Sequence, residues 1–286
     1  MQQNDKYSLI NTARYKLADK LVFGKIREKL GGNIRAFLCG GAALPDDVYE
    51  FFLAVGVTVL QGYGLTENSP VVAVNGFEDN EIGTNGRVLP NLQVQIAEDG
   101  EILVKGPSVM KGYWNDDNAT REAIDDDGWL YTGDIGMFTK KNHLKITDRK
   151  KNIFVSSGGK NIAPQPIENL ICQSKYIEHC VLIGDNRKYI TALLTPNLEQ
   201  LKSLAEDFKI EFKIEDELIT NPMIVRHIQK DIDYLQRDLS KFEKVRRFQI
   251  LSKPFTVDGG ELSPKMSIKR HIVQNKYQDM IEMMYN

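Results

Sequence analysis

Residues 34–64 read IRAFLCGGAALPDDVYEFFLAVGVTVLQGYG, and this stretch decides the fold class of the chain. Apolar runs at 34–39 and 57–60 predict two buried strands, and the spacing of apolar residues at 45–55 predicts a helix between them. The expected buried stripe of that helix is Val48, Phe51, Phe52 and Val55. Because both strands are apolar throughout, the strand–helix–strand order predicts a parallel sheet covered by helices.

The regions around this stretch predict α/β architecture followed by α+β architecture. Residues 7–30 carry apolar side chains at helical spacing and predict an amphipathic helix. Short alternating runs with Gly and Asp turns predict a small, mostly antiparallel β-unit at 80–150. Residues 151–286 alternate between helix-like and strand-like runs and predict a smaller α+β domain with its own core.

The composition is that of a globular protein and excludes several functions. The 286 residues include 42 % apolar and 27 % charged side chains, with a formal net charge of −2. This balance lacks the basic excess that nucleic-acid binding needs. No apolar run could span a bilayer, no signal peptide is visible, and the three cysteines lack metal-binding spacing. We therefore expect free thiols in a cytoplasmic protein that binds no nucleic acid.

The first candidate binding segment is the turn Gly40-Gly41-Ala42-Ala43, at the carboxyl end of the first predicted strand. Ligands bind at that edge of open α/β sheets, and small residues let backbone amides approach a flat ring or a phosphate. The alternative is an ordinary tight turn between a strand and a helix.

The second segment is Gln61-Gly62-Tyr63-Gly64-Leu65-Thr66-Glu67, at the end of the next strand. The Tyr63 ring can stack on a base, the Thr66 hydroxyl can donate to a phosphate oxygen, and Glu67 can hold Mg²⁺, a cation that takes oxygen ligands. The alternative is a loop with a capping threonine, which explains the full string poorly.

Two further segments suggest a ribose site and a hinge. Asp134 stands between glycines after a strand, and its two carboxylate oxygens can accept both hydroxyls of a ribose; an Asx turn is the alternative. The charged run at 147–152, with Gly158-Gly159-Lys160 close behind, predicts a hinge between domains. A solvated charge run is the alternative there.

In this order, the segments resemble the AMP-forming acyl-CoA synthetase (adenylate-forming) superfamily, and in particular the carboxyl-terminal half of a bacterial long-chain fatty-acid–CoA ligase. The strings that carry the resemblance are LVFGKIREKLGGNIRAFLCGGAAL, QGYGLTENSP, GEILVKGPSVMKGYW, DDGWLYTGDIG and ITDRKKNIFVSSGGKNIAPQPIE. The resemblance implies that residues 1–150 form the carboxyl-terminal part of a large α/β domain, with a sheet edge at 1–79 and a barrel-like β-unit at 80–150. It implies that residues 151–286 form a mobile small α+β domain.

The resemblance also implies an enzyme that activates a long-chain fatty acid with ATP and Mg²⁺ and then transfers the acyl group to coenzyme A. The nucleotide would be bound by Gly40, Gly41, Ala42, Gln61, Gly62, Tyr63, Gly64, Thr66, Asp134 and Arg149. Catalysis would fall to Thr66, Glu67 and Lys269, and Glu67 would hold the metal. The hinge would be Lys151, and Gly158, Gly159 and Lys160 would bind CoA.

The sequence departs from the family pattern in two places. It contains no Ser/Thr/Gly-rich phosphate loop, so we expect a fragment of a longer enzyme with little adenylation activity by itself. In the carboxyl-terminal stretch LSPKMSIKR, Ser267 stands where the family has its adenylation lysine. Lys265 and Lys269 lie on either side, and of the two we favour Lys269.

Two other functions remain open at this point, namely a ligase for another carboxylic acid and a noncatalytic nucleotide-binding or interaction module. A truncated large domain would expose the apolar stripes of the helices at 7–30 and 45–55. Such a face favours a homo-oligomer, and contact with a membrane surface is a further expectation.

Overall fold

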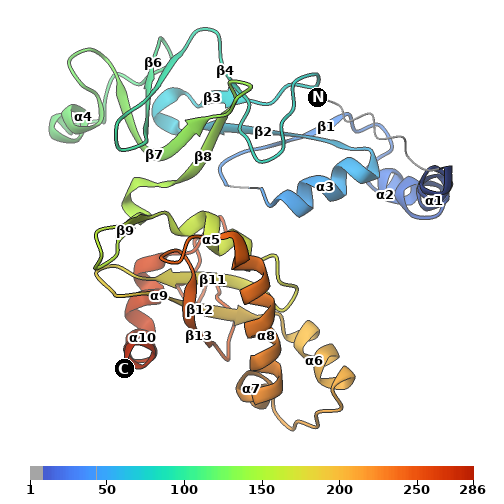
Figure 1. Ribbon diagram of the computed structural model, residues 1–286. Coiled ribbons are helices and arrows are strands. Elements are labelled where there is room, and N and C mark those ends of the chain that lie inside the picture. Colours follow the sequence, from blue (N-terminus) through green and yellow to red (C-terminus); the bar gives the residue numbers. More distant parts are fainter. Residues whose placement is uncertain (1–8, 43) are drawn as a thin grey trace. The chain divides into compact units, whose positions relative to one another are not determined.

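The structure is a computed structural model that describes residues 9–42 and 44–286, with no side-chain description at 9–13 and 47. The predicted start of the first helix at residue 7 and Ala43 of the glycine turn therefore lie outside the described residues. The chain forms two compact units, residues 1–132 with 136–146 and residues 133–135 with 147–286. Each is described by itself, and Figure 1 labels its elements.

A helical segment opens the described chain, as predicted. It runs as α1 (Leu9–Ala18), a π-helical turn η1 (Asp19–Phe23) and α2 (Gly24–Lys29). Gly31 follows it with φ 92°, a left-handed conformation that glycine adopts without steric cost. Arg27 ties this segment to the next helix, because its Nη1 donates to the Val55 carbonyl at 2.5 Å.

The predicted strand–helix–strand order is confirmed in β1 (Ala36–Cys39), α3 (Asp46–Val55) and β2 (Thr58–Gly64). The two strands are parallel, with Cys39 opposite Gln61. The predicted parallel pairing of these two strands is confirmed, but the sheet continues as β1-β2-β3-β4, and β3 (Val71–Val74) and β4 (Arg87–Val88) are added antiparallel. The reason is local: residues 65–70 reverse the chain directly, without a crossover helix.

The predicted stripe of α3 is only partly buried. Val55 is buried as expected, and so is Tyr49, which was not anticipated, whereas Val48 and Phe51 are exposed. Helical spacing identifies an apolar face but not whether another element covers it. Other exposed apolar side chains of the same unit lie on α1, η1, β1 and α3; they are Tyr15, Leu17, Leu21, Val22, Leu38 and Leu53. Self-association through these apolar side chains stays a prediction.

The predicted β-unit is a four-stranded sheet of order β5-β6-β7-β8. Its strands are β5 (Gln93–Ile96), β6 (Glu101–Lys105), β7 (Leu130–Phe138) and β8 (Leu144–Arg149). The hairpin expected around Gly100 is confirmed by the antiparallel pairing of β5 with β6. A short helix, α4 (Asp117–Ala123), was not predicted; its cap is Asp116, which accepts the Ala119 N–H at 2.9 Å.

The second unit is built on a three-stranded sheet of order β11-β12-β13. The strands are β11 (Ile177–Ile183), β12 (Ile190–Pro196) and β13 (Val245–Ile250), preceded by a ribbon of β9 (Phe154–Val155) and β10 (Asn161–Ile162). The helices are α5 (Pro164–Ile171), α6 (Leu198–Asp207), α7 (Glu215–Thr220), α8 (Pro222–Leu235), α9 (Arg270–Lys276) and α10 (Gln278–Tyr285).

Alternating side chains explain why residues 180–183, the second half of β11, are all apolar. Cys180 and Leu182 join a core with α5, α6, α7 and α8, whereas Val181 and Ile183 join a separate core with α9 and α10. The two faces of the sheet are thus both covered by helices, as Figure 1 also shows. A strand buried on both faces needs apolar residues at every position rather than at every second one.

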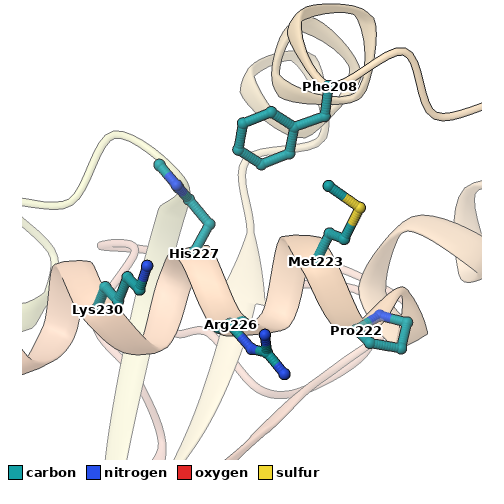
Figure 2. A pocket seen from close by; sticks show the side chains of 6 residues that line it. All are labelled: Phe208, Pro222, Met223, Arg226, His227 and Lys230. Carbon is teal, nitrogen blue, oxygen red and sulfur yellow. The ribbon is translucent and has the colours of Figure 1, made fainter.

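A small pocket lies beside α8 in this unit. Its volume is about 270 Å³, and Phe208, at the end of α6, and Met223 project toward each other across it (Figure 2). The His227 ring stands edge-on to Phe208, with 5.4 Å between ring centroids. None of the residues predicted for the functional site lines this pocket.

A buried ion pair joins α5 to the start of α9. Arg270 Nη2 lies 2.8 Å from the Glu168 carboxylate, which also accepts the Leu182 N–H at 2.7 Å. Burial raises the pKa of the Glu168 carboxyl, and the Arg270 charge opposes that rise. Because the pKa of Glu168 is raised in the folded state, the free energy of unfolding falls as pH rises through that pKa.

We predict that Arg270→Met lowers the free energy of unfolding of this unit by about 3–5 kcal/mol at neutral pH, because Glu168 would be left as an unpaired buried charge. The loss should shrink as pH falls and Glu168 becomes protonated. Hydrogen exchange of β11 amides, measured by mass spectrometry, follows this unit alone. Glu168→Gln combined with Arg270→Met should recover most of the protection; a double variant no better than the single one would contradict the pairing.

Candidate functional site

The glycine turn after β1 and the end of β2 lie next to each other in the first unit. A Cβ on Gly40 would sit 3.4 Å from the Gly62 carbonyl oxygen, so the two backbones are in van der Waals reach. Gly41 has φ 81° and open space around it, and Gly40, Gly41 and Ala42 are all exposed. The parallel pairing of β1 with β2 thus places these two segments beside each other at one sheet edge.

The end of β2 turns back under a tight steric constraint. A Cβ on Gly64 would lie 2.2 Å from the Pro70 carbonyl oxygen, which no side chain tolerates. The Leu65 N–H donates to that same oxygen at 2.8 Å. Gln61–Gly64 therefore belong to the strand itself, and only Thr66 and Glu67 leave it, in the short 3₁₀ helix η2 (Thr66–Asn68).

Neighbouring strands largely bury Tyr63. Its exposed fraction is 9 %, and it packs in a core with Val72, Ala73 and Leu144. Thr66 is exposed and Glu67 is half-buried. Stacking of the Tyr63 ring on a base stays a prediction, and it would use the small part of the side chain that remains accessible.

Tyr113 holds the Glu67 carboxylate, a role that the sequence reasoning missed. The Tyr113 hydroxyl donates to Glu67 Oε1 at 2.9 Å, and the Met110 N–H donates to the Glu67 carbonyl at 2.7 Å. Ser108 donates to the buried Asn68 at 3.1 Å, so residues 106–113 hold the whole η2 turn. Residues 106–114, GPSVMKGYW, lie in one of the strings that carry the family resemblance, but no residue type in them predicts this contact.

The geometry around Glu67 suits a Mg²⁺ ion that is shared with a nucleotide. Mg²⁺ in such sites takes one or two protein carboxylates and completes its shell with phosphate oxygens and water. One Glu67 oxygen is oriented by Tyr113, and no contact to the other is found among the described residues. The residues present therefore fit the metal that the resemblance implies.

We predict that the Tyr113 phenol titrates above its ordinary pKa of 10.0, since it donates to the Glu67 carboxylate and would become an anion beside it. Nuclear magnetic resonance of ¹³Cζ-labelled tyrosine, with the signal assigned by its loss in Tyr113→Phe, measures this pKa. Glu67→Gln should bring it back toward 10.0. An unchanged pKa in Glu67→Gln would show that the contact does not exist in solution.

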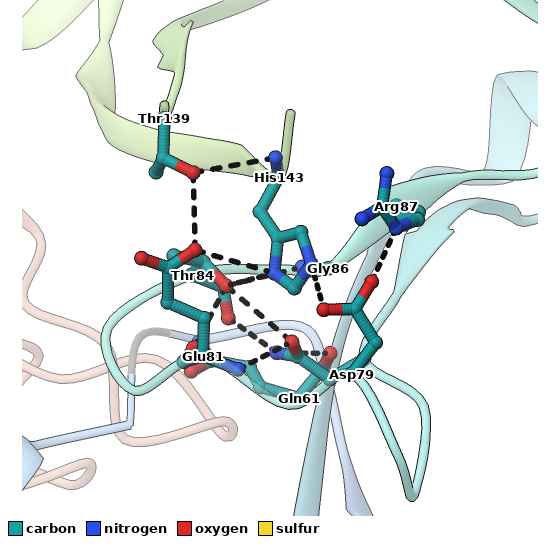
Figure 3. Close-up of polar contacts among 9 residues, drawn as sticks. Gln61, Asp79, Glu81, Thr84, Gly86, Arg87, Thr139 and His143 are labelled. Carbon is teal, nitrogen blue, oxygen red and sulfur yellow. Dashed lines mark hydrogen bonds and ion pairs between the residues drawn. The ribbon is translucent and has the colours of Figure 1, made fainter. Parts of the chain in front are cut away.

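A network of hydrogen bonds and ion pairs holds the end of strand β2 in place (Figure 3). The buried Asn75 donates its backbone N–H to the Gln61 carbonyl at 3.0 Å and its side chain to the Thr84 carbonyl at 2.8 Å. The fully buried His143 places Nδ1 3.3 Å from Thr84 Oγ1 and Nε2 3.0 Å from Asp79 Oδ1. His143 lies 59 residues after Thr84, so local spacing gave no signal for this network.

Asp79 completes this network at the surface. Its carboxylate pairs with Arg87 and faces His143, and these two partners hold the pKa of the carboxyl below its usual value. The carboxylate thus stays ionised and keeps its partners in place over the ordinary pH range.

Asp134 and Arg149, both predicted for the nucleotide, lie together in the second unit. Asp134 is 7 % exposed, and its Oδ1 lies 3.3 Å from Arg149 Nε, whose side chain is largely exposed. The Asx-turn alternative is wrong, because Asp134 sits inside strand β7. Gly136 is needed for close packing, since a Cβ there would lie 2.6 Å from the Lys145 carbonyl oxygen.

The predicted hinge segment is anchored by Asp148, which the sequence reasoning also missed. One oxygen of this buried carboxylate accepts the Arg149 N–H at 2.7 Å, and the other accepts the Gln165 N–H of α5 at 2.8 Å. Lys151 follows, exposed, in the 3₁₀ turn η3 (Lys150–Asn152). The hinge role of Lys151 stays a prediction.

The glycine-rich segment forms the turn between β9 and β10. The Ser156 N–H donates to the Lys160 carbonyl at 2.9 Å, and the Gly159 N–H to the Ser156 carbonyl at 2.8 Å. Gly159 has φ 72° and open space at its Cβ position. Gly158, Gly159 and Lys160 are exposed, and their predicted contact with CoA is untested.

The lysine-bearing stretch near the carboxyl terminus is a tight hairpin. The Ser263 N–H donates to the Ser267 carbonyl at 2.8 Å, and the Ser267 N–H donates to the Ser263 hydroxyl at 3.1 Å. Lys265 lies in the turn of this hairpin, whereas Lys269 lies at its base, with its N–H on the Glu261 carbonyl at 2.7 Å. Both lysines and Ser267 are exposed.

Three observations on the described residues concern membrane spans, metal sites and cysteines. No described helix is long and apolar enough to cross a bilayer. No group of three or more His, Cys, Asp or Glu side chains there could hold a metal ion. Cys39, Cys172 and Cys180 are free thiols; Cys180 is buried, and burial raises the pKa of Cys172 to about 12.

Family models describe two parts of the chain. Residues 6–114 match the model of the AMP-binding enzyme, and residues 151–286 match the model of the AMP-binding enzyme C-terminal domain. Among solved structures, the adenylation domain of a carboxylate reductase from Mycobacterium chelonae superposes with a TM-score of 0.74 at 24 % identity, covering 94 % of this chain and 41 % of that one. At this identity the likeness concerns the fold.

Curated relatives extend the likeness over nearly the whole sequence. The long-chain-fatty-acid–CoA ligase FadD15 of Mycobacterium tuberculosis is 39 % identical over 97 % of this chain and 46 % of its own length. The peroxisomal long chain acyl-CoA synthetase 7 of Arabidopsis thaliana is 35 % identical over 93 % of this chain and 41 % of its own. The chain therefore spans less than half the length of these relatives.

Proposed function

The chain belongs to the AMP-binding enzyme family, and from this membership we propose that it supplies the adenylate-binding and carboxyl-terminal parts of an ATP-dependent fatty-acid–CoA ligase. The observation that carries the proposal is the sheet edge of the first unit. There the exposed glycine turn after β1 lies beside the end of β2, from which Thr66 and the Glu67 carboxylate emerge.

The proposed reaction has two stages, and each places a demand on the protein. A fatty-acid carboxylate first attacks the α-phosphorus of ATP, giving an acyl-adenylate and pyrophosphate; the thiol of CoA then displaces AMP. Negative charge builds on the phosphoryl oxygens during the first stage, so fixed donors at that position lower the barrier. The exposed Thr66 hydroxyl is such a donor, and Glu67 would hold the Mg²⁺ that neutralises phosphate charge.

Asp134 is proposed to accept the ribose hydroxyls, with Arg149 orienting its carboxylate. An ionised carboxylate offers two acceptor oxygens, which matches the two hydroxyls of a ribose. Gly158, Gly159 and Lys160 are proposed to contact CoA after a rotation about Lys151. A cytoplasmic location, a fatty-acid substrate and contact with a membrane surface belong to the same proposal.

Ser267 favours a second candidate, a nucleotide-binding module without adenylation activity. A serine cannot neutralise charge where the family places an ammonium group, and neither neighbouring lysine occupies the same point of the hairpin. A ligase for another carboxylic acid is the remaining alternative. Both alternatives use the same nucleotide site as the proposed ligase, so only a measurement of the chemical step distinguishes them from it.

We predict that AMP binds to the chain and that Asp134→Ala weakens this binding roughly ten- to hundredfold, since a hydrogen bond to a charged group contributes about 1.5–3 kcal/mol. Isothermal titration calorimetry measures both affinities. Asp127→Ala, at an exposed position of the same β-unit, removes the same charge and should leave AMP binding unchanged. Equal losses in the two variants, or no AMP binding at all, would refute the proposed nucleotide site.

We further predict that Ser267→Lys raises fatty-acid-dependent pyrophosphate release when this chain replaces the matching part of the Mycobacterium tuberculosis relative. A cation at the transferring phosphoryl group is expected to raise the rate by about a hundredfold or more. Lys269→Ala and Lys265→Ala in the Ser267 background identify any lysine that already takes this role. A chimera that binds AMP but stays inactive with Ser267→Lys would favour the module over the ligase.

A further inference from the structure

The pocket beside α8 combines apolar and basic side chains, and the proposed function uses none of them. It is lined by three apolar residues, by three basic residues and by no acidic residue; they are Phe208, Pro222, Met223, Arg226, His227 and Lys230 (Figure 2). Such a lining matches a ligand that is apolar at one end and negatively charged at the other.

Helical periodicity places the apolar and basic parts of the pocket on one face of α8. Met223, His227 and Lys230 follow one another at spacings of four and three residues, which keeps side chains on the same side of a helix. The isoleucines of the opposite face lie in the core of the unit. At a rise of about 1.5 Å per residue, Met223 and Lys230 are roughly 10 Å apart along the helix axis. The two parts therefore occupy different positions along α8.

The cations of this pocket have no acidic partner. Arg226 and Lys230 are one helical turn apart, and no carboxylate of the described residues lies within ion-pair distance of either. The aspartates of the same helix are engaged elsewhere, because Asp231 accepts the Ser174 hydroxyl and Asp233 accepts glutamine side-chain amides. Like charges at this spacing destabilise a helix, and an anion bound between them would remove that cost.

Aromatic rings hold the middle of the pocket in place. The His227 ring stands edge-on to Phe208 and also to Tyr176, with 5.3 Å between the centroids of His227 and Tyr176. Tyr176 is buried, and Phe208 packs against the core of the unit. The imidazole, whose N–H can donate to an anion, is therefore restrained by its neighbours before any ligand arrives.

The volume of the pocket limits the size of its ligand. About 270 Å³ lies just below the range of pockets for drug-sized molecules, so a whole nucleotide does not fit. Acetate or inorganic phosphate would leave Phe208 and Met223 facing water, and an uncharged hydrocarbon would leave Arg226 and Lys230 without a counter-ion. A small anion that carries an apolar chain uses both parts of the lining.

We propose that the pocket beside α8 binds an amphiphilic anion, an apolar chain that ends in a carboxylate or a phosphate group. The chain would contact Phe208 and Met223, and the anionic group would lie at Arg226 and Lys230, with His227 as a further donor. Within the proposed function, on which this choice of source rests, the ligand is a fatty acid held by residues that the nucleotide site does not use. A lipid of a membrane surface carries the same chemistry, so the experiment separates the two sources.

The test uses octanoate as the probe and nuclear magnetic resonance of the full chain labelled with ¹³C at the methionine methyl groups. The Met223 signal, assigned by its loss in Met223→Gln, should shift and saturate as octanoate is added, because this side chain lines the pocket. The signal of Met283, which is exposed on α10 and does not line the pocket, should stay unchanged. Equal shifts of both signals without saturation would overturn the site, because they would reflect nonspecific binding.

Both the charge and the chain of the ligand should be required. Arg226→Glu with Lys230→Glu should weaken octanoate binding by about tenfold or more, and acetate and octan-1-ol should each bind the unchanged protein more weakly than octanoate by a similar factor. The control, Lys213→Glu with Lys253→Glu, makes the same charge change at exposed positions outside the pocket. Equal losses in the two double variants would refute the proposed pocket contacts, since they would reflect net charge alone.

The membrane source is tested by sedimentation with vesicles of phosphatidylcholine containing phosphatidylglycerol. Vesicle binding that Arg226→Glu with Lys230→Glu abolishes, together with no octanoate binding, would replace the free fatty acid with a membrane lipid. Asp134→Ala should leave octanoate binding unchanged, because Asp134 does not line the pocket. A chain that binds AMP through Asp134 but neither octanoate nor vesicles would refute this inference and leave the proposed function standing.

Discussion

The contact between Gly64 and the backbone of residue 70 is the constraint on which the candidate site depends. A methyl group at position 64 would lie 2.2 Å from the Pro70 carbonyl oxygen, so the strand can reverse here only with glycine. This reversal ends β2, starts the η2 turn and directs Thr66 and Glu67 away from the sheet. Residues 106–113 then fix the carboxylate through Tyr113, and Asn75 fixes the strand end through Gln61.

Charge is organised differently in the two units. In the first, the cations and carboxylates around His143 are paired with each other and serve to hold a loop behind the strand. In the second, a buried pair of Glu168 and Arg270 joins α5 to the base of the lysine hairpin. Removing one partner of such a buried pair is costly, because it leaves the other charge buried and uncompensated.

Ser267, at the position where the resemblance implies an adenylation lysine, lies in a hairpin. Hydrogen bonds between residues 263 and 267 close the hairpin that carries it. Arg270, which follows the hairpin, donates to the Leu182 carbonyl. Lys265 therefore lies in the turn of the hairpin and Lys269 at its base, on either side of residue 267. Ser267 thus places an uncharged side chain at this point of the hairpin.

Local sequence patterns predicted several of the elements and selected the candidate residues, whose roles stay predictions. Apolar runs and glycine positions identified β1, α3, β2 and the hairpin around Gly100, because helix and strand periods are properties of neighbouring residues. The antiparallel return of β3, the exposure of Val48, the Tyr113–Glu67 contact and the Asp148–Gln165 contact were decided only by the tertiary structure. Each depends on which distant segment lies beside a residue, and periodicity within one segment carries no information about its partner.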